Sequence, residues 1–175
     1  MFRDNSLIPS EAVRLAALGL LAEGPRHYGD LAAEIRYLTS RLAGPSLDLM
    51  GTSLELLRFE GLIAAAEPSE DALLTITAKG RATLQALLQA HLRAPLGDYN
   101  RLVLLLKLRF IDLLPAAERQ AQMALIAESL EGELARLEDL RRHHAGRPGP
   151  FGDWLDHDIA ALKARLALLA APAAQ

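Results

Sequence analysis

Hydrophobic residues near the start of the chain recur every three to four positions. Between Pro9 and Gly24 they are spaced i, i+3, i+4, i+7 and i+8, at Val13, Ala16, Ala17, Leu20 and Leu21. This spacing places all of them on one face of a helix. Pro9-Ser10 is a typical helix start, and Gly24-Pro25 is a typical stop. We therefore predict a first amphipathic helix between these two signals.

The same pattern predicts two more helices, over about 28–38 and 46–60, with Gly44-Pro45 between them. Gly61 ends the second of this pair, because glycine easily adopts the positive φ needed to leave a helix. The residues expected to face the core are Leu31, Ile35 and Leu38 in the first of the pair and Met50, Leu54 and Leu57 in the other.

Short apolar runs replace the helical spacing after Gly61. Residues 62–66 and 73–76 flank a polar turn from Glu67 to Asp71, which is typical of a β-hairpin. Thr77 favours the start of another helix, reaching to about Arg93, because a threonine hydroxyl can accept from a free backbone N–H of the first turn. Three helices, a two-stranded wing and a fourth helix, in this order, predict a winged helix-turn-helix domain over residues 1–94.

The second half of the chain is predicted to be helical, over about 101–113, 115–144 and 153–170. In the middle helix the apolar residues have a mean spacing of about 3.5, the coiled-coil period. They are Met123, Ile126, Leu130, Leu134, Leu137 and Leu140. We predict that residues 95–175 form a helical, coiled-coil-like dimerisation domain, so that the protein is mainly α. Trp154 and Leu162 of the last helix are expected in the same dimer interface. Packing of this stripe within one subunit is the alternative.

Composition narrows the class of protein. The chain has 175 residues, of which 51% are hydrophobic, and this excludes a disordered chain. It has no cysteine, which excludes disulfides and thiolate metal sites and fits a cytoplasmic location. The first residues lack the apolar segment of a signal peptide, and the apolar runs are too short to span a bilayer. We therefore expect no membrane attachment.

No combination of residues predicts an enzyme. Serine, histidine and aspartate occur without a nucleophile turn, and the chain has no glycine-rich phosphate loop. Asp153 and His157 stand at i and i+4, where two metal ligands can share a helix face, but no third ligand completes a site. We expect neither catalysis nor a bound metal or cofactor.

Several short motifs occur together in a specific order. They are Ala17-Leu18-Gly19-Leu20-Leu21 with Gly24-Pro25, His27-Tyr28-Gly29-Asp30-Leu31, Glu60-Gly61-Leu62-Ile63, Thr77-Ala78-Lys79-Gly80-Arg81 and Pro115-Ala116-Ala117-Glu118-Arg119. With this order and spacing the chain resembles the PadR family of bacterial transcription regulators, including its AphA-like branch, over about residues 10–170. The resemblance implies a homodimer that binds a double-stranded DNA operator. In some members it also implies a small apolar effector between the subunits.

The third helix is the one that the resemblance places in the major groove. The candidate DNA-binding residues are Tyr28, Arg41, Thr52, Ser53, Arg58 and Lys79. Yet the outward face expected for this helix carries Leu49, Leu56 and Phe59, and no lysine or arginine. Two motif positions also depart from the family: Gly51 stands where a tyrosine is usual, and Tyr28-Gly29 have swapped order.

Charge leaves a second interpretation open. The net charge is −3, and residues 1–80 contain 7 basic and 11 acidic residues, a balance of −4. Glu67, Glu70 and Asp71 make the predicted wing tip acidic, where it would meet phosphates of like charge. The alternative to an operator-binding regulator is a degenerate acidic winged helix that serves as a protein-interaction module. Trp154 is a candidate either for lining an effector cavity or for an ordinary interface anchor.

Overall fold

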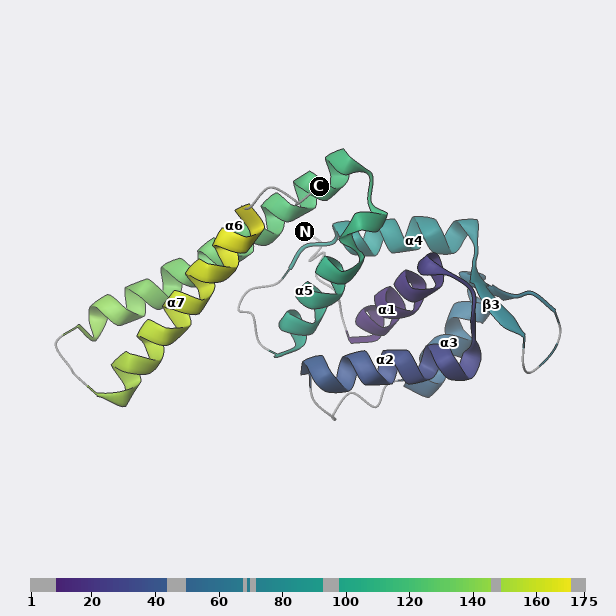
Figure 1. Cartoon of the computed structure of the whole chain (residues 1–175), viewed down its shortest axis with the longest axis horizontal. Helices are drawn as coiled ribbons and strands as arrows, with labels where there is room; N and C mark the ends of the chain where they lie inside the picture. The colour runs from purple at the N-terminus through teal and green to yellow at the C-terminus, as the bar shows by residue number, and fades with distance from the viewer. Residues whose placement is uncertain are drawn as a thin grey trace, which may run out of the picture.

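The computed structural model describes residues 9–43, 50–67, 69, 72–92, 98–145 and 149–170. These residues form a mainly helical protein with one small antiparallel sheet (Figure 1), which confirms the predicted fold class. The elements are α1 (Pro9–Glu23), β1 (Arg26–His27), α2 (Tyr28–Ala43), α3 (Met50–Phe59), β2 (Ile63–Ala65), β3 (Leu73–Ile76), α4 (Ala78–Gln89), α5 (Asp98–Phe110), η1 (Ile111–Leu113), α6 (Ala116–His143) and α7 (Pro150–Ala170).

Helix α1 is the centre of the hydrophobic core. All of the residues predicted to line its apolar face are buried: Val13, Ala16, Ala17, Leu20 and Leu21. The helices α2, α3, α4 and α5 pack around it, and Figure 1 shows α1 enclosed between α2, α4 and α5. Burial on several sides explains why α1 is rich in apolar residues. Its alanines let the neighbouring helices approach closely, and its leucines fill the space between them.

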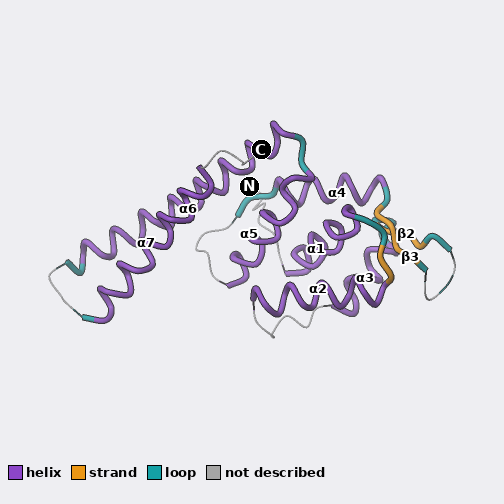
Figure 2. The backbone as a smooth tube through the Cα atoms, in the orientation of Figure 1, coloured by secondary structure: helices purple, strands orange, loops and turns teal. Residues whose placement is uncertain are grey.

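The sheet contains one strand more than the sequence predicted. Its order is β1-β3-β2, with Ile63 opposite Ile76 and Arg26 opposite Leu74. Figure 2 shows the strands in orange at the end of the protein away from the arm. The hairpin of β2 and β3 is the predicted wing. The extra strand β1 has only two residues, too few for a period-two pattern, and it forms because the chain leaving α1 passes the open edge of β3.

The junction between α3, the sheet and α4 depends on Thr77 and Gly80. The Thr77 hydroxyl accepts from the Gly80 N–H at 3.0 Å and donates to the Gly61 carbonyl at 2.8 Å. A Cβ atom on Gly80 would lie 2.1 Å from the Leu62 carbonyl oxygen, so only glycine fits there. Gly61 has a φ of 70°, the left-handed conformation expected at the end of α3. The predicted helix cap at Thr77 is therefore confirmed, and it also fixes the start of β2.

The helices α6 and α7 form an antiparallel hairpin that projects from the rest of the protein as an arm (Figure 1). Arg141 donates to both carboxylate oxygens of Asp156, at 2.7 and 3.0 Å, and this holds the pKa of Asp156 below its ordinary value. Lys163 and Glu138 form a second ion pair at 2.8 Å. Both pairs join α6 to α7 on the surface of the hairpin.

Helix α5 lies between the arm and the core. It packs against α1 and α2, and it buries Leu102, Val103, Leu106 and Phe110 in the same cluster as α1. The predicted division into domains 1–94 and 95–175 separates α5 from this cluster, and it stays a prediction. Within the described residues, no helix is long and apolar enough to cross a membrane.

Candidate nucleic-acid interface

Helix α3 presents one face to the core and the other to solvent. Leu54 and Leu57 are buried, as the sequence predicted. The opposite side carries Leu56, of which 47% is exposed, and Phe59, of which 90% is exposed. The outward direction expected for these two residues is therefore confirmed, and α3 offers a partly apolar surface to a partner.

Part of this surface falls outside the described residues. Leu49 is not described, and for Thr52 and Ser53 the structure describes only the helical backbone. Their assignment to DNA contacts stays a prediction. Glu67 of the wing is exposed, whereas Glu70 and Asp71 lie outside the described residues.

Tyr28 and Arg58 line the same hollow, although 30 positions separate them in the sequence. The hollow has a volume of about 180 Å³ and lies between the start of α2, the end of α3 and the sheet. Its remaining lining residues are Glu55, Ala65, Ser69, Ala72 and Leu74. Arg58 also lies 3.9 Å from the Glu55 carboxylate, so part of its charge is neutralised within α3.

Arg41 and Lys79 lie elsewhere on the N-terminal half. Arg41 is in the last turn of α2, about 20 Å along the helix from Tyr28. Its guanidinium lies over the Tyr37 ring, 5.6 Å from the ring centroid. Lys79 donates to the Glu60 carbonyl at 2.8 Å, at the end of α3. Of the four candidates whose side chains the structure describes, it thus brings together Tyr28 and Arg58.

Several other cations of the N-terminal half pair with its own carboxylates. Arg14 lies 2.9 Å from Glu60, and Arg26 lies 3.6 Å from Glu23. Arg109 of α5 donates to Glu23 as well. These ion pairs neutralise part of the charge within the protein, so they lower the positive potential that DNA phosphates would meet.

The predicted dimer stripe is partly covered within one subunit. Ile126, Leu130 and Leu162 are buried, because α6 packs against α7 and also contacts α4 and η1. Met123, Leu134 and Leu137 are half-buried at the edge of the same cluster. Trp154 differs, with 67% of its surface exposed. Intra-subunit packing thus accounts for part of the stripe and leaves Trp154 open to a partner.

A second apolar row on α7 did not emerge from the sequence. Trp154, Ala161 and Leu168 are spaced by seven positions, which is about two helical turns, so they share one side of α7. Leu168 has 75% of its surface exposed. The seven-residue spacing was the available signal, but the stronger leucine stripe on the other side of α7 obscured it.

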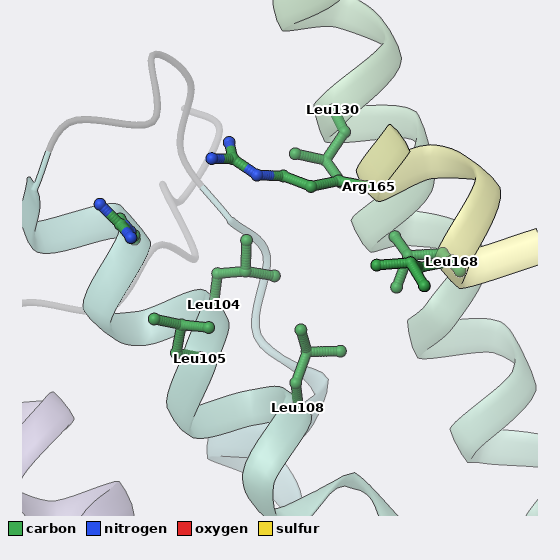
Figure 3. A pocket seen from close by; sticks show the side chains of 8 residues that line it. Leu104, Leu105, Leu108, Leu130, Arg165 and Leu168 are labelled. Carbon is green, nitrogen blue, oxygen red and sulfur yellow. The ribbon is translucent and has the colours of Figure 1, made fainter. Parts of the chain in front are cut away.

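A cavity of about 280 Å³ separates the arm from α5 (Figure 3). Leu104, Leu105 and Leu108 point into it from α5, and Leu130 and Leu168 face them from the arm. Arg101 and Arg165 are the charged residues among those that line it. An apolar chamber with cationic groups suits a small amphipathic anion. Trp154, the sequence candidate for an effector cavity, is not among the residues that line it.

Lys107 is a buried cation that the sequence analysis missed. None of its surface is exposed, and its ammonium group donates to the carbonyls of Leu87, Leu88 and Ala90 at the end of α4. Gln122 of α6 also donates to the Ala90 carbonyl, at 3.4 Å. Burial lowers the pKa of Lys107 to about 8. The signal in the sequence was a lone lysine within an otherwise apolar run.

No metal site is found in the part of the chain that the structure describes. There, no group of three or more histidine, aspartate or glutamate side chains is arranged to hold an ion. Asp153 and His157 are both exposed on the outside of α7.

Comparisons with known proteins place the chain in a family. The AphA-like transcriptional regulator model matches residues 2–172. No protein of curated function matches the chain.

Three crystal structures are similar at low sequence identity. Bacillus subtilis PadR in complex with p-coumaric acid is 18% identical, with 95% of this chain and 100% of that chain covered and a TM-score of 0.43. Bacillus subtilis PadR in complex with operator DNA is 20% identical, with coverages of 89% and 93% and a TM-score of 0.39. The protein smu.1604c from Streptococcus mutans UA159 is 18% identical, with coverages of 89% and 95% and a TM-score of 0.41. Since the family model spans nearly the whole sequence, the chain belongs to the AphA-like transcriptional regulators, as its motifs predicted.

Proposed function

We propose that this protein is a homodimeric regulator that binds operator DNA through α3 and the adjoining hollow. The observation that supports it best is the open outer face of α3, with Tyr28 and Arg58 beside it. In a helix-turn-helix the recognition helix enters the major groove, while neighbouring cations and hydroxyls contact phosphates. Membership of a family of transcription regulators supports the same function.

Selection of genomic fragments by the purified full-length protein tests this proposal. At low salt we expect one enriched sequence motif with two-fold symmetry. Arg58→Ala and Tyr28→Phe should weaken binding to it. Arg142→Ala on α6 is the matched control, since Arg142 is an exposed cation of the arm that pairs within its own helix. If no sequence is enriched, the acidic N-terminal half is better explained as a protein-interaction module.

We propose that the dimer forms along the outer row of α7. Two α7 helices that pair antiparallel around Ala161 would place Trp154 of each against Leu168 of the other, because the three positions are equally spaced. Charge favours the same pairing. Asp158 in the first half of α7 and Arg165 in the second half stand one turn from members of this row, so antiparallel pairing brings opposite charges together.

Sedimentation of variants tests this interface. Trp154→Glu and Leu168→Glu should shift the protein towards monomers, since each places a carboxylate in a desolvated contact. Ala160→Glu is the matched control, because Ala160 is exposed on the same helix about 100° away from Ala161. A Trp154→Glu, Leu168→Glu double variant that sediments as an intact dimer contradicts this pairing.

We further propose that the cavity between α5 and the arm binds a small apolar effector. Leu168 belongs both to the cavity wall and to the outer row of α7, so a ligand there would act on the dimer contact. The probe is 1-anilinonaphthalene-8-sulfonate, an apolar anion, added to the folded protein. We expect saturable binding that Leu108→Trp removes by filling the cavity. Unchanged binding by this variant would count against the site.

A further inference from the structure

We propose that Leu56 and Phe59 read the 5-methyl groups of thymines in the operator, so that α3 recognises sequence mainly by apolar contact. This inference rests on the proposed DNA binding. It adds the kind of base contact that this particular helix makes.

The two side chains form one apolar patch on the solvent side of α3. They stand at i and i+3, which places them next to each other on the helix surface. Their exposed fractions are 47% for Leu56 and 90% for Phe59. The buried residues Leu54 and Leu57 fix the rotation of α3, so the patch cannot turn into the core. A phenyl ring held almost wholly in water is poorly explained by folding alone and fits contact with a partner.

The described side chains of α3, residues 54–59, offer few hydrogen-bonding groups for reading base edges. They include one cation, Arg58, and one carboxylate, Glu55, which pair at 3.9 Å. Arg58 also faces the hollow beside Tyr28. A guanidinium on guanine is the commonest specific contact, and residues 54–59 therefore offer few groups to make it.

Thymine is the natural partner for an apolar patch in the major groove. It is the base that presents a methyl group there, and leucine or phenylalanine side chains can cover that methyl and remove it from water. The acidic charge balance of the N-terminal half also favours base contacts over phosphate contacts. Phosphate contacts usually supply much of the affinity, but residues 1–80 have a balance of 7 basic and 11 acidic residues. Base contacts must then contribute a larger share of specific binding.

Uracil substitution tests the inference, because it removes one methyl group and leaves every hydrogen-bonding atom of the base. The operator is first selected with the full-length protein. Each thymine is then replaced singly by uracil, and the Kd is measured by fluorescence anisotropy. We expect one or two positions in each half-site at which uracil raises the Kd about 3- to 10-fold, the effect of one buried methyl group.

Variants then connect the methyl groups to these residues. Leu56→Ala and Phe59→Ala should weaken binding to the thymine operator and reduce the uracil effect at their own positions to less than about 2-fold. Leu113→Ala is the matched control, because Leu113 is also a partly exposed leucine but lies in η1, outside α3. It should keep the full difference between thymine and uracil.

Three results would overturn the inference, and they are distinguishable. If the operator binds specifically but no uracil changes the Kd, α3 does not read methyl groups, while the regulator proposal stands. If Phe59→Ala and Leu56→Ala bind the operator as the wild type does, the patch lies away from DNA and serves a protein contact. If no operator is selected at all, the proposed function itself fails.

Discussion

The ring of Phe110, at the end of α5, lies directly on the Cα of Gly19 in the middle of α1. A Cβ atom on Gly19 would come within 2.6 Å of the ring. Glycine inside a helix costs about 1 kcal/mol relative to alanine, so its presence in α1 needs a reason. The close approach of α5 supplies that reason, and it joins two segments that lie about ninety positions apart in the sequence.

Gly19→Ala should therefore lower the free energy of unfolding by about 1–2 kcal/mol, because overpacking against Phe110 outweighs the gain in helix propensity. Gly132→Ala is the control. Gly132 also lies within a helix, but nothing lies within 4 Å of a Cβ placed there, so this change should stabilise the protein slightly. Urea unfolding measures both. A Gly19→Ala variant as stable as the wild type would show that Phe110 moves aside without cost.

The packing of α5 on α1 also predicts which N-terminal fragments of the protein fold. A fragment of residues 1–114 should fold, because it keeps α5 with Leu106 and Phe110 in the core around α1. A fragment of residues 1–94 should be unfolded or aggregated, since it exposes the core residues that α5 covers. Thermal melting followed by circular dichroism distinguishes the two. A cooperative transition for 1–94 would support a domain boundary between α4 and α5.

Lys107 should make stability depend on pH in the alkaline range. Its pKa is lowered from 10.5 to about 8 by burial, so between these values the unfolded chain holds more protons than the folded protein. Stability should therefore rise from pH 8 to pH 10.5, by on the order of 3 kcal/mol.

Two substitutions test whether Lys107 causes this increase in stability with pH. Lys107→Met should remove the rise, although it also leaves the carbonyls at the end of α4 without their donor. Lys79→Met, at an exposed lysine, should keep it. The measurement is the urea midpoint across this pH range. Parallel curves for the wild type and Lys107→Met would show that the pKa of Lys107 is not lowered.

The features predicted correctly from the sequence are local ones. The apolar face of α1 follows from helical spacing, and Thr77 was identified as a helix cap from its residue type and position. The outward direction of Leu56 and Phe59 also followed from the spacing, once Leu54 and Leu57 were placed in the core. Such inferences need only the geometry of one helix.

The features that were missed depend on contacts between distant segments. The strand β1 exists because β3 passes beside it, and no pattern within two residues can signal this. Lys107 is accommodated in the core because its ammonium group donates to three carbonyls in and just after the last turn of α4, which lie 17 to 20 positions away in the sequence. Tyr28 and Arg58 line one hollow only after α2 and α3 have packed. The sequence shows each of these residues, but it does not show which distant residues they contact.

The Thr77 hydroxyl should matter more for stability than an ordinary threonine hydroxyl in a helix. It accepts from the Gly80 N–H at 3.0 Å and donates to the Gly61 carbonyl at 2.8 Å, so it joins α4 to the end of α3 and to the wing. Thr77→Val keeps the shape of the side chain but leaves both groups without this partner. We expect a loss of about 1–2 kcal/mol in the free energy of unfolding, from the lost helix cap and the lost hydrogen bond.

Thr83→Val is the matched control for Thr77→Val. The Thr83 hydroxyl donates to the Lys79 carbonyl at 3.0 Å, on the exposed surface of α4, and that carbonyl belongs to the ordinary helix ladder. Removing such a hydroxyl should change stability by less than about 0.5 kcal/mol. Because Thr77 fixes where the wing leaves α3, its variant should also weaken operator binding, measured below the unfolding transition, whereas the Thr83 variant should not. Equal effects of the two changes on stability and on DNA binding would mean that the junction is held by packing of Gly80 on Leu62 and not by the hydroxyl.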